Sequence, residues 1–149
     1  QPGQIRDAVQ AWLMQQAKLN FTQRLDHFAP QLGVQWKRLS LSNASSRWGT
    51  ASADGSIRLN WRLIHFKQDV IDYVVVHELA HLHEMNHSPA FWNVVASILP
   101  DHVARRKELQ KENSFMLSEN AQIPINPEDA NKRVNPMNSA PIFAATKSE

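Results

Sequence analysis

The sequence contains no cysteine among its 149 residues. Disulfide bonds and thiolate metal sites are therefore excluded, which leaves histidine, aspartate and glutamate as the strong ligands for a transition metal. The chain also lacks an apolar run of the roughly 18 residues that a membrane-spanning helix requires, and its first residues have no signal-peptide centre. We therefore expect a cytoplasmic protein without a membrane partner.

A strong excess of one charge is also missing. Sixteen basic and fourteen acidic residues give a formal net charge of +2, which does not indicate nucleic acid as a partner. The densest basic run, Arg105 to Lys107, has acidic neighbours at Glu108 and Glu112 and is typical of a solvated helix face. Glycine is scarce as well, and the four glycines lie too far apart to form a phosphate-binding loop.

The length and the hydrophobic content of 42% suit one domain with one core. We expect this domain at residues 1–113. Residues 114–149 then form a tail rich in asparagine and proline, with no helical period, which is expected to be disordered. The chain starts with Gln1, which suggests processing from a longer protein. The sequence does not determine the oligomeric state.

The first half of the domain predicts one helix followed by a sheet. Apolar residues at helical spacing indicate a long amphipathic helix over Gln4–Phe28 that ends before Pro30. Strands are expected at Val34–Leu41 and Arg47–Ser52. An Asp-Gly turn then leads into a third strand, Ser56–Arg62, whose residues alternate between apolar and polar. We expect a small antiparallel sheet in which the third strand keeps one edge free.

The second half predicts further helices, so the fold class is α+β. Val70–Leu82 is apolar on almost every side and should form a buried helix. Ser88 followed by Pro89 is typical of a helix start, and Pro100 ends that helix. Asp101 can then cap a last helix that runs to about Asn113.

The segment from His77 to His81 reads His-Glu-Leu-Ala-His inside the buried helix. Positions four apart differ by about 40° around a helix axis and about 6 Å along it, so both imidazoles can reach one cation. Glu78 then lies where its carboxylate can take a proton from water activated by the metal. Two imidazoles and a carboxylate are costly in an apolar helix, and a cation would offset that cost. The pattern predicts a zinc-dependent hydrolase with Glu78 as general base.

His87 is the predicted third metal ligand, because the helix is expected to stop at Asn86 and a turn can bring the next residue back to the metal. His83 lies about 240° around the helix from His77 and is expected to be packed or exposed. Glu84 is on the right face but one turn further along, which suits a hydrogen bond to a ligand imidazole. The remaining histidines are expected to be structural or surface residues: His27, His65 and His102.

An ordered series of motifs is more specific than His-Glu-x-x-His alone. They are Ser46-Arg47-Trp48-Gly49, Ile57 to Ile64, Ile71 to His81, Asn86-His87-Ser88 and Phe91-Trp92. Over Ala8 to Leu109 the chain resembles the YgjP-like family, which groups with the SprT-like and WLM zinc metallopeptidases. The resemblance implies a small gluzincin-like α+β domain. Zinc would be held by His77, His81 and His87, with Glu78 as the base.

Peptide-bond hydrolysis is the leading expected function, because a free strand edge beside a zinc helix can hold an extended peptide by main-chain pairing. The alternative is hydrolysis of a nucleoside triphosphate, an activity suggested for some relatives. Arg47, Arg58 and Arg62 would then stabilise phosphoryl charge, and the last two would share one strand face. A third possibility is a non-catalytic zinc-stabilised binding module, against which Glu78 speaks because a structural zinc site needs no base. Tyr73 is a candidate oxyanion donor.

Overall fold

The structure is a computed structural model that describes residues 2–119 of the chain, with side chains up to Lys111. In chain order its elements are α1 (Pro2–Leu32), β1 (Arg38–Ser42), β2 (Gly49–Ala51), β3 (Ser56–Asn60), the 3₁₀ helix η1 (Trp61–His65), α2 (Gln68–Ala80), α3 (Pro89–Ile98) and α4 (His102–Glu119). The predicted α+β class is confirmed. The expected tail lies outside the described residues from position 120 onward.

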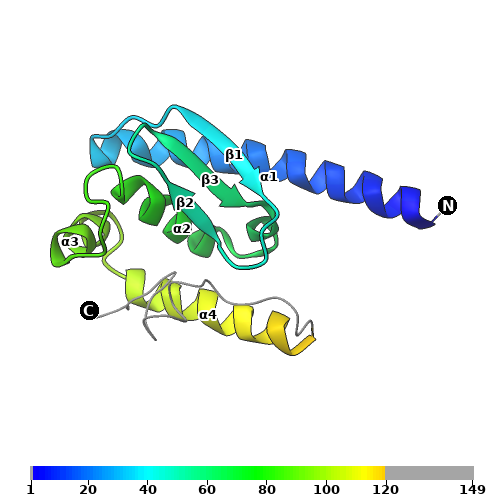
Figure 1. Cartoon of the computed structure of the whole chain (residues 1–149). Coiled ribbons are helices and arrows are strands. Elements are labelled where there is room, and N and C mark those ends of the chain that lie inside the picture. Colours follow the sequence, from blue (N-terminus) through cyan, green and yellow to red (C-terminus); the bar gives the residue numbers. More distant parts are fainter. Residues whose placement is uncertain (1, 120–149) are drawn as a thin grey trace.

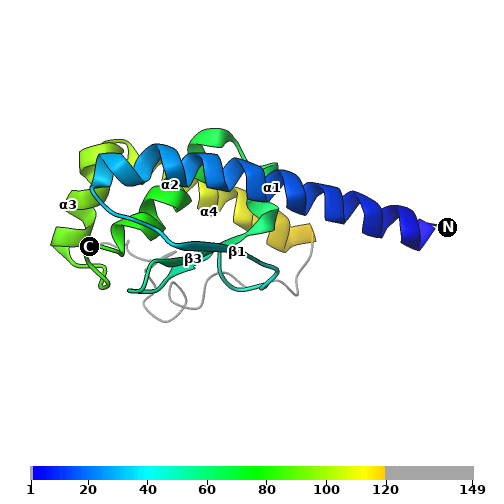
Figure 2. The same cartoon turned by 90° about the horizontal axis from the view of Figure 1, so that it is seen from above.

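The helices and the sheet form two layers. Figure 1 shows the strands in front of α1 and α2, and in Figure 2 the sheet is seen edge-on with these helices on one side of it. The core lies between the layers, where Leu39, Ile57 and Leu59 of the sheet are buried together with most of α2. None of the described helices combines the length and the hydropathy that a bilayer crossing demands.

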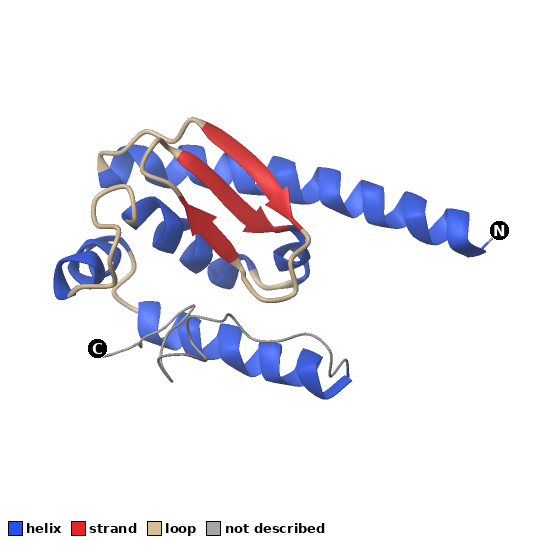
Figure 3. Ribbon diagram, in the orientation of Figure 1, coloured by secondary structure: helices blue, strands red, loops and turns tan. Residues whose placement is uncertain are grey.

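The sheet has the strand order β1-β3-β2 (Figure 3). β2 and β3 form the predicted hairpin, whose turn contains Gly55 at a φ of 96°, whereas β1 runs parallel to β3. The expectation of a purely antiparallel sheet is therefore wrong. The loop at residues 43–48 lets β1 occupy the far edge of β3, where Leu39 and Ile57 are paired and buried.

Because β3 is the central strand, the unpaired edges of the sheet belong to other strands than the sequence predicts. Both edges of β3 are hydrogen-bonded, so the expectation of a free edge on Ser56–Arg62 is wrong. Trp61 and Arg62 belong to η1, and the predicted strand ends at Asn60. Within the described residues, the unpaired strand edges are the outer ones of β1 and β2.

Helix α1 continues through Pro30, contrary to the expected end before it. A proline this close to a helix end removes one late hydrogen bond, and burial of Phe28, Ala29 and Leu32 outweighs that loss. The helix ends in a Schellman motif at Gly33, which has a φ of 71°. The N–H groups of Gly33 and Val34 donate to the carbonyl oxygens of Pro30 and Ala29, both at 3.1 Å.

A partly buried ion pair joins α1 to α2. Nε and Nη2 of Arg24 donate to the two carboxylate oxygens of Asp72 at 2.8 and 2.9 Å, and Gln68 donates to the same carboxylate at 3.0 Å. The bidentate contact fixes the N-terminal half of α2 against α1.

The later helices begin where the sequence predicts. The hydroxyl of Ser88 accepts a hydrogen bond from the N–H of Phe91 at 3.3 Å, and Pro89 is the first residue of α3. α4 starts directly after Asp101 but continues to Glu119, so the expected end near Asn113 is wrong. No glycine or proline interrupts α4, which explains why the helical conformation persists.

Candidate metal centre

Helix α2 carries the His-Glu-x-x-His segment into the core. Every residue from Val70 to Ala80 is buried, which confirms the predicted buried helix. The helix ends at Ala80, but His81 keeps a right-handed helical conformation with φ −64° and ψ −17°. The four-residue helical relation between His77 and His81 is therefore preserved although the helix ends earlier than expected.

Three imidazoles converge at the C-terminal end of α2. The possible ligand atoms of His77, His81 and His87 all lie within 4.8 Å of one another, and their ring centroids are 4.7 to 5.1 Å apart. His87 comes from the loop between α2 and α3. These three residues can hold a metal ion, and the geometry brings together the same three histidines that the sequence nominates.

A backbone hydrogen bond orients His81. Its Nδ1 lies 3.1 Å from the carbonyl oxygen of Glu84, so the ring donates there and Nε2 is the nitrogen available to a metal. The sequence predicted such a bond from the side chain of Glu84, whereas the structure gives it to the main chain. His83 contacts the carbonyl oxygen of Leu32 at the end of α1 and so has the structural role expected of it.

Glu78 is enclosed beside the imidazoles. Its side chain is 3% exposed, and Oε2 lies 3.0 Å from Nδ1 of His77. Burial raises the pKa of Glu78 to about 7, while the charges of His81 and Arg47 act in the opposite direction. Burial likewise lowers the pKa of His81 to about 4, which keeps this imidazole in the neutral form that binds metals. A carboxyl group with a pKa near 7 can both accept and release a proton at neutral pH.

Strand β2 passes directly over Glu78. A methyl group placed on Gly49 would lie 3.0 Å from Cγ and 3.1 Å from Oε2 of Glu78, and 3.0 Å from Cδ2 of Leu59. Only a residue without a side chain allows the strand to come this close. Sequence reasoning missed this role of Gly49. The signal available was a glycine inside a short strand, which often marks a close approach of the backbone.

Aromatic rings wall the histidine cluster on the α3 side. Phe91 packs against all three imidazoles with ring centroids 4.5 to 5.0 Å away. Trp92 is stacked on His87 at 6.0 Å, and His102 is stacked on Trp92 at 5.4 Å. An apolar wall of this kind restricts water around the imidazoles and limits the rotation of His87.

Other nominated residues lie outside the cluster. Tyr73 is fully buried one turn before His77, and their rings are 5.9 Å apart. Arg62 lies over the ring of Trp61 on η1, so the expectation that it shares a strand face with Arg58 is wrong. The remaining histidines have structural contacts: His27 with Phe28, His65 with Trp61 and His102 with Trp92.

Comparison with known proteins identifies a matching family and similar solved structures. A model of the family described as "YgjP-like, metallopeptidase domain" matches residues 1–112. Among solved structures, the chain is similar to the metallopeptidase zymogen of Pyrococcus abyssi abylysin, with a TM-score of 0.55 and 24% identity over 70% of this chain and 98% of that one. It is also similar to the zymogen of Methanocaldococcus jannaschii jannalysin, with a TM-score of 0.53 and 17% identity over 64% and 96%. No curated protein gives a match.

The likeness to the two zymogens shows the fold, and the family match reaches over most of the chain. The resemblance to the YgjP-like family is thereby confirmed, whereas the wider grouping with SprT-like and WLM proteins stays a prediction. The family supplies the class of reaction, and the three converging histidines supply a place for the metal ion. The chain therefore belongs to the YgjP-like metallopeptidase family and is a metal-dependent peptidase.

Proposed function

We propose that the protein is a zinc peptidase in which His77, His81 and His87 bind the ion. The observation that carries this proposal is the convergence of three imidazoles on one point beside a buried glutamate. Three neutral nitrogen ligands without a thiolate suit zinc, and a catalytic zinc site leaves a fourth position open. When bound, zinc supplies a Lewis acid that polarises a carbonyl group and lowers the pKa of water.

Glu78 is the general base in this proposal. Its carboxylate accepts a proton from the attacking water and later gives it to the leaving amine. The enclosure of Glu78 against β2 supports this role, because the backbone at Gly49 lies close to the carboxylate and limits its freedom to turn away. A general base must be held within hydrogen-bonding reach of the water, and such packing provides that constraint.

The substrate is an extended peptide that pairs with the outer edge of β2. This edge replaces the β3 edge that the sequence suggested. β2 is unpaired on its outer side among the described residues, and Gly49 places it against Glu78. Main-chain pairing with such an edge aligns a peptide without regard to its sequence. The scissile bond would then lie beside the base.

Two alternatives remain to be tested against this function. The nucleotide alternative relied in part on Arg58 and Arg62 sharing a strand face, and they lie on different elements. Arg47 and Arg58 still provide cations near β2. The alternative of a non-catalytic zinc module leaves the buried Glu78 without a purpose, because a structural zinc site needs no adjacent base.

The decisive experiment compares the zinc-loaded wild-type protein with Glu78→Gln. The amide keeps the shape of the side chain but cannot take a proton, so zinc content should stay at one ion per chain. Cleavage of an unstructured peptide should fall by roughly 10²- to 10⁴-fold. Matched assays would offer denatured protein, peptides and a set of nucleoside triphosphates to both proteins.

Near-normal peptide cleavage by Glu78→Gln, with zinc confirmed present, would show that another group is the base. Release of pyrophosphate that depends on Glu78, without peptide cleavage, would overturn the peptidase assignment. Zinc binding without turnover of either substrate class would support the binding-module alternative. Elemental analysis of each preparation keeps these three outcomes distinct.

A further inference from the structure

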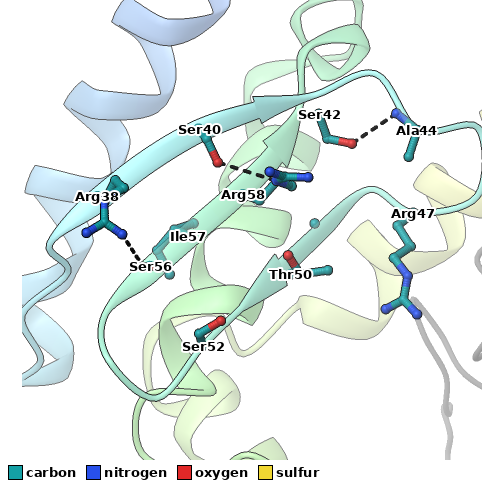
Figure 4. A pocket seen from close by; sticks show the side chains of 11 residues that line it. Arg38, Ser40, Ser42, Ala44, Arg47, Thr50, Ser52, Ser56, Ile57 and Arg58 are labelled. Carbon is teal, nitrogen blue, oxygen red and sulfur yellow. Dashed lines mark hydrogen bonds between the residues drawn. The ribbon is translucent and has the colours of Figure 1, made fainter.

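The face of the sheet that points away from the helices forms a polar groove of about 630 Å³ (Figure 4). Helices α1 and α2 cover the opposite face of the sheet (Figure 2), and α3 and α4 lie beside the sheet (Figure 1). The groove is lined by three arginines, Arg38, Arg47 and Arg58, and by five hydroxyl side chains. None of its lining residues is acidic. The face is therefore cationic and rich in hydrogen-bond donors.

Two of these arginines are held in place by neighbouring hydroxyl groups. Nη1 of Arg38 donates to Oγ of Ser56 at 3.1 Å, and Nε of Arg58 is 3.4 Å from Oγ of Ser40. Neither guanidinium has a carboxylate within 4.0 Å among the described residues. A guanidinium has five N–H donors, so both keep donors for a further acceptor.

Asp54 is close enough to Arg38 for the charge of the guanidinium to lower the pKa of its carboxyl group. Its carboxylate accepts a hydrogen bond from the N–H of Ser56 at 3.0 Å. Hydrogen bonds from Ser56 are the largest cause that lowers the pKa of Asp54, and the charge of Arg38 contributes less. Asp54 therefore belongs to the turn and forms no ion pair with Arg38 or Arg58.

The sheet register sets the spacing of the cations. Arg38 lies opposite Ser56, which places it diagonally from Arg58, two residues further along β3. Diagonal neighbours on a sheet are roughly 7–8 Å apart. Side chains on one face of an extended peptide repeat about every 6.6–6.8 Å, since each residue adds about 3.3–3.4 Å. A peptide that crosses the sheet face obliquely from β3 to β1 can therefore place acidic residues at alternating positions next to these two arginines.

The groove adjoins the metal centre through β2. Gly49 lines the groove and also lies close to Glu78. Arg47 lines the groove as well, and its charge lowers the pKa of Glu78. Thr50 lies opposite Arg58 in the register and has a short side chain. A peptide paired with the β2 edge can therefore place an acidic side chain over Thr50, toward Arg58.

We propose that Arg38 and Arg58 on the outer sheet face bind acidic side chains of the substrate where its chain continues from the β2 edge across that face, and so select acidic polypeptides for cleavage. This inference rests on the proposed peptidase function. An acidic peptide fits better than a phosphate group because the cations are spread along two strands and the glycines form no phosphate-binding loop. Carboxylates also pair well with the guanidinium fork.

The test uses two fluorescent peptides that share one core and carry Glu-x-Glu or Gln-x-Gln on one side of it. Binding is measured by anisotropy with zinc-loaded Glu78→Gln, which separates binding from turnover. We expect the glutamate peptide to bind on the order of tenfold more tightly at low salt, and less so as ionic strength rises. Adding Arg38→Gln and Arg58→Gln should bring the two dissociation constants to within about twofold.

Arg6→Gln is the matched control for each single substitution, Arg38→Gln or Arg58→Gln, because it also removes one positive charge, from an exposed position on α1 outside the groove. It should leave the preference for the glutamate peptide intact. The same arginine variants are also made in the protein that retains Glu78. In each of them, the ratio of kcat/KM for the two peptides should follow the ratio of their binding affinities.

Equal binding of the two peptides, or a preference that survives loss of both arginines, would overturn the inference. If both peptides are cleaved equally well, the peptidase function stands and the acidic preference fails. If neither is cleaved but the binding preference depends on the two arginines, the groove assignment stands and the peptidase function fails. Displacement of the glutamate peptide by a nucleoside triphosphate at far lower concentration would favour phosphate as the ligand and overturn the proposal.

Discussion

The two halves of helix α2 bury polar side chains in opposite ways. In the N-terminal half, the charge of Asp72 is compensated within the chain by Arg24 and Gln68. In the C-terminal half, His77, Glu78 and His81 face one another and His87, around a point that a cation can occupy. The first arrangement is complete as an ion pair, whereas the second gains its full compensation from a bound metal.

One continuous helix therefore carries residues that hold the fold in its first half and residues of the candidate metal centre in its second half. Arg24 and Asp72 fix where α2 lies, and the histidines then depend on that position. We expect substitutions in the first half to change stability with little effect on zinc stoichiometry. Substitutions in the second half should do the reverse. The predictions below test that separation.

The largest effect is expected for His81→Ala. Loss of one of three imidazoles should lower zinc affinity by more than about 100-fold, because even partners that only orient a ligand cost roughly 10- to 100-fold. His83→Ala is the matched control, since His83 contacts Leu32 and lies outside the cluster. Competition with a chelator measures both affinities. Unchanged zinc affinity in His81→Ala would show that His81 is not a metal ligand.

Gly49→Ala tests whether β2 positions the base. The added methyl group would lie 3.0 Å from Cγ of Glu78, which must then move. The contact requires a shift of a few tenths of an ångström, and because misplacement by about 1 Å can cost roughly 10²-fold, we expect peptide turnover to fall by about 3- to 10-fold with zinc retained. Gly3→Ala, where nothing lies within 4 Å of the added group, should leave turnover unchanged. Equal turnover of the two variants would show that Glu78 tolerates the contact.

Arg24→Met tests the N-terminal half. The substitution keeps much of the apolar stem but leaves the buried carboxylate of Asp72 without its cation. We expect a loss of about 2 kcal/mol in the free energy of unfolding, measured with denaturant at fixed zinc concentration. Lys67→Met removes one side of an exposed pair with Glu108 at 3.9 Å and should cost less than about 0.5 kcal/mol. If folded Arg24→Met bound less zinc per chain, the N-terminal half of α2 would also be needed for metal binding, and the two halves would not be independent.

Asp54→Asn should have the smallest effect, because Asp54 lies in an exposed turn outside both halves. The pKa of Asp54 is lowered in the folded state, chiefly by hydrogen bonds from Ser56. The charged carboxylate therefore stabilises the fold above the ordinary pKa of 3.8, and this contribution disappears as the pH falls through the lower folded value. The melting temperatures of the two proteins should differ slightly at pH 7 and converge in acid. A constant difference would show that charge is not the cause.

Much of the site could be predicted because its signals are local. The spacing of His77 and His81 specifies their common helix face, and Ser88-Pro89 specifies the start of α3 that follows His87. Each of these patterns acts within one or two turns of chain. The positions of the histidines and the buried character of α2 follow from such patterns without knowledge of the rest of the fold.

Long-range pairing could not be predicted in the same way. Arg24 and Asp72 are 48 residues apart, and no local pattern links them. The parallel alignment of β1 with β3 is likewise set by which faces pack, since alternation of apolar residues indicates a strand but not its neighbour. The helical conformation at Pro30 persists because burial of Phe28 and Leu32 outweighs one lost hydrogen bond.

The sequence by itself determined the histidines of the candidate metal centre, the adjacent glutamate and the α+β class, because helical periodicity and capping are properties of short segments. Only the tertiary structure decided that β2, and not β3, presents its edge at the metal centre, that Gly49 encloses Glu78, and that Arg38 and Arg58 share an open sheet face. The physical reason is that strand order depends on the burial of side chains far apart in the chain. Residues on neighbouring strands acquire their spacing only once that order is fixed.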